Sequence, residues 1–135
     1  MHSQYDHSAA SGAGKSVGRA IARMHPSDAE KRGLKDDDVI KVFNDRGACL
    51  AAVAVTDRIR PDVIELETGA WYDPLDPEDP MSLEVHGNPN VLTRDVGTSQ
   101  LSQGSTAHSC LVEVEKYQGE LPGIKVFSQP EVEFR

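Results

Sequence analysis

The residues best suited to bind a ligand lie between Val85 and Gly104. This stretch is rich in amide, hydroxyl and glycine residues and contains few strong acids or bases. An Asn or Gln side chain presents a donor beside an acceptor, and glycines let the main chain approach a flat ligand closely. Such a composition favours recognition of a neutral heterocycle over acid–base catalysis. A turn-rich loop that satisfies its own backbone groups is the alternative interpretation.

A second candidate is the run Gly-Ala-Gly-Lys-Ser at residues 12–16, which has the ending of a phosphate-binding loop. The complete pattern requires an earlier glycine where this chain has Ala9, and it follows a strand, which is not predicted here. We therefore interpret residues 12–16 as a flexible, weakly basic loop.

Other catalytic patterns are weak. No two of the 5 histidines are spaced to share a metal on a predicted helix, and no nucleophile elbow is present. Cys49 and Cys110 lie far apart without a Cys-x-x-Cys pair, so we interpret both as buried strand thiols. The dipeptide Gly104-Ser105 fits the cleavage point of a self-processing pyruvoyl enzyme on a small barrel, but this dipeptide is common in loops.

Periodic apolar residues predict the elements that position these groups. Residues 25–33 are expected to form a short helix, with Pro26 at its first position and Gly33 at its left-handed end. The turn at residues 44–47 joins two strands into a hairpin. The expected strands cover residues 20–24, 39–43, 48–56, 62–67, 110–115 and 124–127.

Two segments lack periodicity. Residues 1–20 are rich in Ser, Ala and Gly, so we expect an irregular segment that is ordered by a partner surface or a ligand. Residues 71–104 begin with prolines at every third position from Pro74, which disfavours both helix and sheet. A loop this long in a compact domain usually binds something or is disordered.

Composition sets the remaining bounds. The 135 residues fit one domain, residues 1–135, and the expected fold class is mainly β, a small barrel with one or two short helices and a long loop. A formal charge of −8 disfavours nucleic acid as a partner. No apolar run reaches the roughly 18 residues that span a bilayer, so no membrane is expected either.

The sequence also resembles a known family: the C-terminal domain of molybdenum oxidoreductases of the dimethyl sulfoxide, trimethylamine N-oxide and biotin sulfoxide reductase group, with the biotin sulfoxide reductase branch nearest. The matching segments run in order along nearly the whole chain. They are His2-Ser3-Gln4, His25-Pro26-x-Asp28-Ala29, Arg32-Gly33, residues 42–47, Gly69-Ala70-Trp71-Tyr72-Asp73-Pro74, residues 86–93, Gly97-Thr98-Ser99, Gln103-Gly104, residues 107–110 and residues 111–115.

The resemblance implies a double-psi β-barrel that covers a cofactor funnel. The implied cofactor is molybdenum bis(molybdopterin guanine dinucleotide), bound in the full-length enzyme. By matching position, the residues expected to contact it are His2, Ser3, Gln4, Asn90, Gln103 and Gly104. No catalytic residue and no metal ligand is expected in this chain, because the resemblance places both in other domains.

Two departures from the family pattern matter for the fold. The family turn Asp-Gly-Asp is Asp36-Asp37-Asp38 here, so Asp37 would be strained if that turn requires a positive φ. Family members also carry a strand just before His-Ser-Gln, where this chain has Met1. We therefore expect the barrel to lack one strand and to expose an edge.

The first functional hypothesis is a cofactor-binding domain of a reductase that removes oxygen from S-oxides or N-oxides, inactive by itself, with the remaining domains of that enzyme as partners. The compartment, the individual substrate and the oligomeric state stay open. The alternative is a free-standing double-psi barrel that acts as a small subunit or a protein-interaction module. A third interpretation, a decarboxylase-like barrel enzyme, would require cleavage at residues 104–105.

Overall fold

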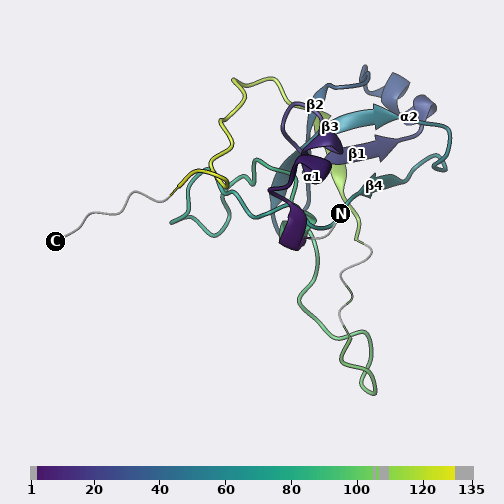
Figure 1. Cartoon of the computed structure of the whole chain (residues 1–135). Helices are drawn as coiled ribbons and strands as arrows, with labels where there is room; N and C mark the ends of the chain where they lie inside the picture. Colours follow the sequence, from purple (N-terminus) through teal and green to yellow (C-terminus); the bar gives the residue numbers. More distant parts are fainter. Residues whose placement is uncertain (1–2, 105, 107–109, 130–135) are drawn as a thin grey trace.

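The computed structural model describes residues 3–104, 106 and 110–129. These residues form one curled, mixed five-stranded sheet, a half-barrel, with short helices at its margin (Figure 1). The strands are β1 (Ile21–Met24), β2 (Val39–Phe43), β3 (Ala48–Val55), β4 (Ile64–Leu66) and β5 (Glu113–Lys116). The helices are α1 (Ala9–Ala13), α2 (Pro26–Lys31) and the 3₁₀ turns η1 (Ser3–Tyr5) and η2 (Pro89–Val91).

The sheet order is β4-β1-β3-β2-β5. Only the β1–β3 pair is parallel, with Ala22 opposite Val53, and the other pairs among the described strands are antiparallel. The predicted hairpin is confirmed, because β2 and β3 are neighbours and the amide of Asn44 donates to the carbonyl of Gly47 at 3.0 Å. The prediction of a mainly β fold is therefore confirmed.

Helix α2 begins and ends as its sequence predicts. His25 is the N-cap, and its Nδ1 accepts a hydrogen bond from the amide of Ser27 at 3.2 Å. Pro26 occupies the first helical position, where its missing N–H costs nothing. Gly33 has a φ of 62°, the left-handed conformation that stops a helix.

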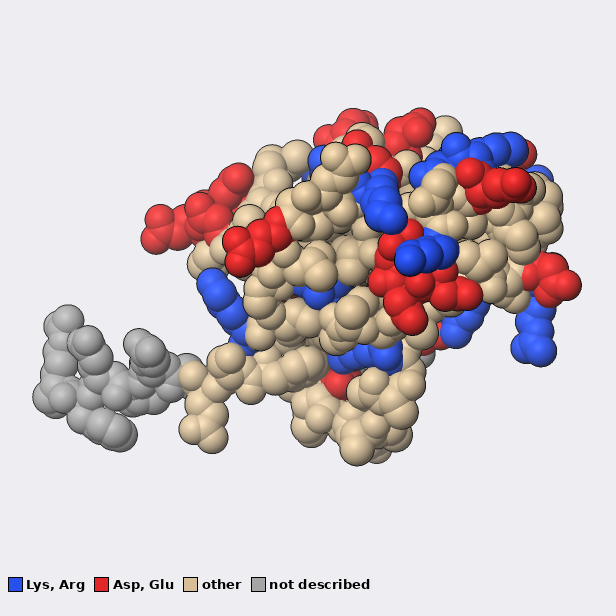
Figure 2. All heavy atoms as spheres, turned by 90° about the horizontal axis from the view of Figure 1, so that it is seen from above, with Lys and Arg blue, Asp and Glu red and all other residues tan. Residues whose placement is uncertain are grey.

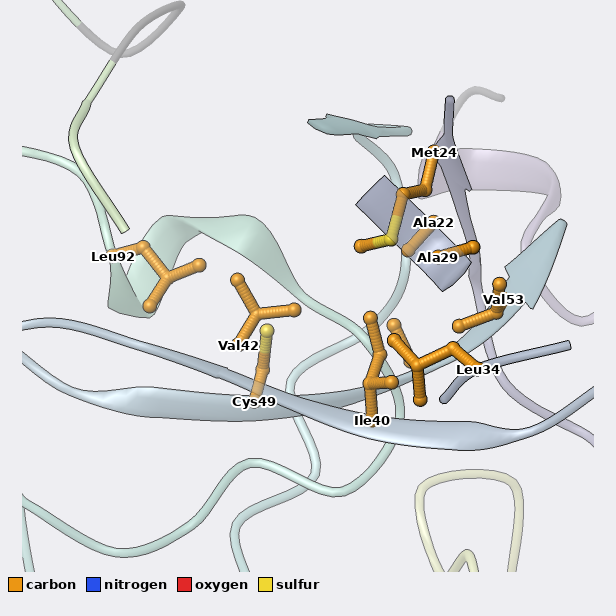
Figure 3. Close-up of a cluster of buried hydrophobic side chains, with 10 residues drawn as sticks. Ala22, Met24, Ala29, Leu34, Ile40, Val42, Cys49, Val53 and Leu92 are labelled. Carbon is orange, nitrogen blue, oxygen red and sulfur yellow. The ribbon is translucent and has the colours of Figure 1, made fainter. Parts of the chain in front are cut away.

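The core fills the concave side of the sheet (Figure 3). Ile40 and Val42 from β2 pack with Cys49 from β3, which confirms Cys49 as a buried strand thiol. Leu92, which directly follows η2, belongs to the same cluster and so anchors the long loop to the core of the half-barrel. Cys110 is only half-buried and precedes β5 rather than lying within it.

Two predictions for the chain ends need correction. Residues 124–127 form no strand, because the amides of Lys125 and Val126 donate to the Asp73 carboxylate at 2.6 and 3.0 Å instead of to a neighbouring strand. The described part of residues 1–20 is not simply irregular, since it contains η1 and α1. The side chain of Ser8 caps α1 by accepting from the amide of Ser11 at 3.2 Å.

The long loop was predicted correctly as a segment without regular strands. Residues 71–104 contain η2 and isolated bridges only, and their last part extends away from the sheet (Figure 1). No helix among the described residues is long and apolar enough to cross a membrane. On the face in Figure 2, acidic and basic side chains are intermixed and do not form one basic patch.

Candidate functional site

A pocket of about 510 Å³ lies where three segments that are distant in the sequence meet. Its described lining carries hydroxyl, amide, aromatic and backbone groups but no charged side chain. The lining residues are Ser3, Thr68, Gly69, Ala70, Trp71, Tyr72, Asn88 and Asn90. The volume is within the range of about 300–1,000 Å³ that is usual for small-molecule sites.

The N-terminal segment is attached to the pocket through Trp71. The backbone amide of Trp71 donates to the carboxylate of Asp6 at 2.8 Å, and its indole N–H donates to the carbonyl of Ser3. The rings of His7 and Phe127 lie 5.5 and 5.4 Å from the indole. Ser3 therefore lies at the pocket because Trp71 binds both the Ser3 carbonyl and the side chain of Asp6 in the same segment.

The same segment contains a buried ion pair. Lys15 Nζ lies 2.6 Å from Asp6 Oδ1, with the two side chains 5% and 0% exposed. Lys15 also donates to the Asp6 carbonyl at 3.1 Å and lies 4.8 Å from the ring centre of Phe127. The interpretation of residues 12–16 as a flexible basic loop is therefore wrong: α1 extends into this run, and its lysine is buried and paired.

The second wall of the pocket is arranged around Glu84, which is fully buried. One carboxylate oxygen accepts from the amides of Asp73 and His86 at 3.2 and 3.0 Å. The other accepts from the amides of Gly87 and Asn88 at 2.7 and 2.8 Å. Burial raises the pKa of Glu84 to about 7, although these four hydrogen bonds act in the opposite direction.

His86 and Gly87 connect this wall to its surroundings. His86 Nδ1 donates to the Trp71 carbonyl at 3.0 Å, and burial lowers the pKa of His86, which favours the neutral ring. Gly87 has a φ of 99°, and a Cβ at this position would lie 2.6 Å from the Cβ of Ala20. Only glycine fits this close approach.

Asn88 positions Asn90. The Asn88 side-chain oxygen accepts from the Asn90 amide at 2.9 Å and thereby starts η2. Asn88 is buried, whereas Asn90 is exposed at the pocket. The Asn90 side chain is thus exposed at the pocket on a backbone that Asn88 and Glu84 hold in place.

The structure brings together two of the six residues predicted to contact the cofactor, Ser3 and Asn90. Gln4 lies beside Ser3 in η1 but does not line the pocket, and His2 lies outside the described residues. Gln103 and Gly104 belong to the extended part of the long loop, where the Thr98 amide donates to the Gly104 carbonyl at 2.8 Å. They do not line the pocket either.

Sequence reasoning missed the segment from Thr68 to Tyr72 as a pocket wall. The run Gly69-Ala70-Trp71-Tyr72 at the start of the long loop could have identified it, since glycine permits close approach and an exposed ring offers a flat surface. Tyr72 is 49% exposed. Among the described residues, no group of three or more His, Cys, Asp or Glu side chains could hold a metal ion.

An uncharged pocket with amide, hydroxyl and aromatic groups is suited to bind a flat polar ring by hydrogen bonds and stacking. Comparison with known families agrees. Residues 1–111 match the family described as "Molydopterin dinucleotide binding domain". The chain therefore belongs to the molybdopterin dinucleotide-binding domain family, and the predicted family is confirmed.

Its relatives include several reductases. The chain is 47% identical over 120 residues to biotin sulfoxide reductase of Cereibacter sphaeroides, an alignment that covers 89% of the chain and 16% of that protein. It is 46% identical over 113 residues to trimethylamine-N-oxide reductase of Salmonella typhimurium, covering 84% of the chain and 13% of the relative. It is 44% identical over 114 residues to the dimethyl sulfoxide/trimethylamine N-oxide reductase of Cereibacter sphaeroides, an alignment that covers 84% of the chain and 14% of the relative.

Proposed function

We propose that the pocket binds one ring system of molybdopterin guanine dinucleotide. The observation that supports this most directly is that Ser3 and Asn90, which are far apart in the sequence, line one uncharged pocket. A pterin or guanine ring carries alternating donors and acceptors on its edge, and an amide side chain can pair with such an edge. The donor set of the pocket therefore fits the organic part of this cofactor.

Each wall has a separate task in this proposal. The Asn90 amide reads the edge of the ring, and the Ser3 hydroxyl donates to a polar group of the ligand. The exposed ring of Tyr72 offers a surface for stacking. Gly69 lets the main chain approach the ligand closely. None of these groups is required to transfer a proton.

The remaining predicted contacts stay part of the proposal. A dinucleotide is longer than one pocket of about 510 Å³, so other residues must bind the parts that extend beyond it. We assign this role to His2, Gln4, Gln103 and Gly104. For Gln103 and Gly104 this requires the extended part of the long loop to lie along the cofactor.

At the level of the whole enzyme, the chain is proposed to be one domain, residues 1–135, of a molybdenum reductase that acts on S-oxides or N-oxides. Its relatives are named for such reactions, and the chain covers only 13–16% of the three described above. When bound, the molybdenum cofactor would supply oxygen-atom transfer. The residues described here would bind and orient its organic part, and the other domains are the proposed partners.

The half-barrel is proposed to belong to the double-psi barrel type. A mostly apolar pocket of about 600 Å³, whose lining also includes Asp28 and Arg32, is lined by residues of both edge strands, among them Leu66 of β4 and Val114 of β5. Such a space between two edges fits a barrel that is open along one side. A further strand placed there would close it.

The test uses the oxidised, metal-free dinucleotide as the probe and measures its affinity for the chain by titration. Asn90→Ala is expected to weaken binding about tenfold, because a hydrogen-bonded edge contact contributes on the order of 1–2 kcal/mol. The matched control is Gln118→Ala, an exposed amide outside the pocket, which should bind like the parent chain. Gln103→Ala tests the extended loop in the same way.

Equal affinity for the Asn90→Ala and Gln118→Ala variants would overturn the assignment of the pocket. If Gln103→Ala alone weakens binding, the dinucleotide contacts the loop and not the pocket.

A further inference from the structure

The backbone of Glu84 is hydrogen-bonded to the sheet, and its side chain contacts the pocket walls. Its amide donates to the Ala48 carbonyl at 2.9 Å, and its carbonyl accepts from the Leu50 amide at 2.8 Å. Both partners belong to β3, the central strand of the sheet. The backbone of Glu84 is therefore held against the central strand of the sheet by two hydrogen bonds.

From this position, the carboxylate contacts both pocket walls. The amide of Asp73 follows the wall that contains Trp71 and Tyr72, and the amides of residues 86–88 lead into the wall that contains Asn90. We propose that Glu84 is a positioning residue of the cofactor pocket, whose carboxylate holds the two walls at the separation that the ligand requires. This inference rests on the proposed function for the identity of the ligand.

The chemistry of the four contacts explains why the residue is an acid. All four partners are N–H donors, so each side-chain oxygen must accept twice. A glutamine would supply only one oxygen, and its NH₂ group would face two donors. Arg19 interacts electrostatically with Glu84 but donates hydrogen bonds to the carbonyls of Val17 and Pro122, at 3.1 and 2.6 Å. The hydrogen bonds described for the Glu84 carboxylate therefore all come from backbone amides.

This arrangement makes the pocket walls sensitive to protonation of Glu84. A proton converts one acceptor oxygen into a donor that faces amides, so at least one wall contact weakens. The pKa of Glu84, about 7, puts this change near neutral pH. The titratable and charged groups around the carboxylate are Arg19, Cys49 of β3, Asp73 and His86.

The experiment is an amide ¹H–¹⁵N NMR titration of the complete 135-residue chain without ligand, followed by titration with the metal-free dinucleotide. In the parent chain, the amide signals of residues 73 and 86–88 are expected to move together with one midpoint near pH 7. Glu84→Gln should abolish that shared transition and weaken dinucleotide binding at least tenfold at pH 8. Glu78→Gln, an exposed acid of the same long loop, is the control and should change neither.

The positioning role would be overturned if the parent chain shows the shared midpoint but the folded Glu84→Gln variant binds the dinucleotide as tightly as the parent chain. The absence of a shared midpoint in the parent chain would overturn the inference that both walls respond together to the charge of Glu84, and this measurement does not depend on whether the variant folds. If the parent chain shows the shared midpoint but does not bind the dinucleotide, the proposed function fails instead, since the amide titration requires no ligand.

Discussion

At the scale of single residues, buried charge determines the pocket. Glu84 is compensated by backbone amides, and the ion pair of Asp6 and Lys15 lies beside the aromatic ring of Phe127. Buried charges are costly to desolvate, so each must be fully paired for the fold to tolerate it. Removing only one member of a buried pair should therefore lower the free energy of unfolding more than removing both charges together.

The first prediction concerns the pH dependence of stability. The pKa of Glu84 rises on folding from its ordinary 4.5 to about 7, so the folded chain binds this proton more tightly than the unfolded chain. The resulting stabilisation is complete below about pH 4.5 and is lost as the pH rises through 7. The free energy of unfolding of the parent chain should fall by up to about 3 kcal/mol relative to Glu84→Gln across this window.

Urea unfolding of both proteins at several pH values measures this difference. His86 has the opposite sign, because its lowered pKa gives a stabilisation that is lost as the pH falls, but it is present in both proteins and cancels. A constant difference across the window would contradict the assigned pKa of Glu84.

The second prediction concerns the ion pair. Asp6→Asn leaves the buried ammonium of Lys15 without its carboxylate, so the free energy of unfolding should fall by about 3–5 kcal/mol. The double variant Asp6→Asn, Lys15→Met removes both charges and should regain most of that loss. Chemical denaturation of the three proteins measures both changes, and a double variant as unstable as the single one would show that the pair is not the cause.

At the scale of elements, the turn at residues 36–38 combines an unusual backbone conformation with a contact to the N-terminal segment. Asp37 has a φ of 67°, so the turn of three aspartates does adopt the positive φ for which glycine is the usual residue. Its carboxylate accepts a hydrogen bond from the Ser16 hydroxyl, a contact between the N-terminal segment and this turn. Strain at Asp37 could be anticipated from the resemblance to the family, whereas the contact with Ser16 could not.

The third prediction compares two glycines. Gly87→Ala should destabilise the fold by about 2–4 kcal/mol, because a Cβ would overlap Ala20 and the φ of 99° is unfavourable for alanine. Gly12 lies in α1, where an added Cβ would meet no atom within 4 Å, so Gly12→Ala should stabilise by about 0.5–1 kcal/mol. Thermal unfolding of both variants measures the contrast, and equal effects would contradict the close approach at Gly87.

At the scale of the whole molecule, the pocket lies at the surface of a half-barrel, and under the proposed function its volume of about 510 Å³ would hold only part of a dinucleotide. The fourth prediction is that the purified chain retains cofactor weakly, because the remaining contacts must come from other domains. Pterin fluorescence of the denatured, oxidised sample should be well below one equivalent per chain. A stoichiometric amount would contradict the view that this domain is only one wall of the cofactor site.

The sequence determined the local elements and the family. Helix α2, the β2–β3 hairpin and the long loop follow from capping residues, turn residues and alternation, which act over a few neighbouring positions. The resemblance to the family also predicts Ser3 and Asn90 as cofactor contacts; both line the pocket, and the contact itself stays a prediction. Residues 124–127 were wrongly predicted as a strand because no local pattern shows that their amides bind Asp73.

Only the tertiary structure decided which residues meet. It placed Thr68–Tyr72 beside Ser3 and Asn90, buried Lys15 against Asp6 and gathered two walls around Glu84. These contacts join positions far apart in the chain, and their energy depends on burial and on distances that local periodicity does not encode. The sequence does not distinguish a buried glutamate with four amide partners from an exposed glutamate. Only the tertiary structure shows that the Glu84 carboxylate joins the two pocket walls.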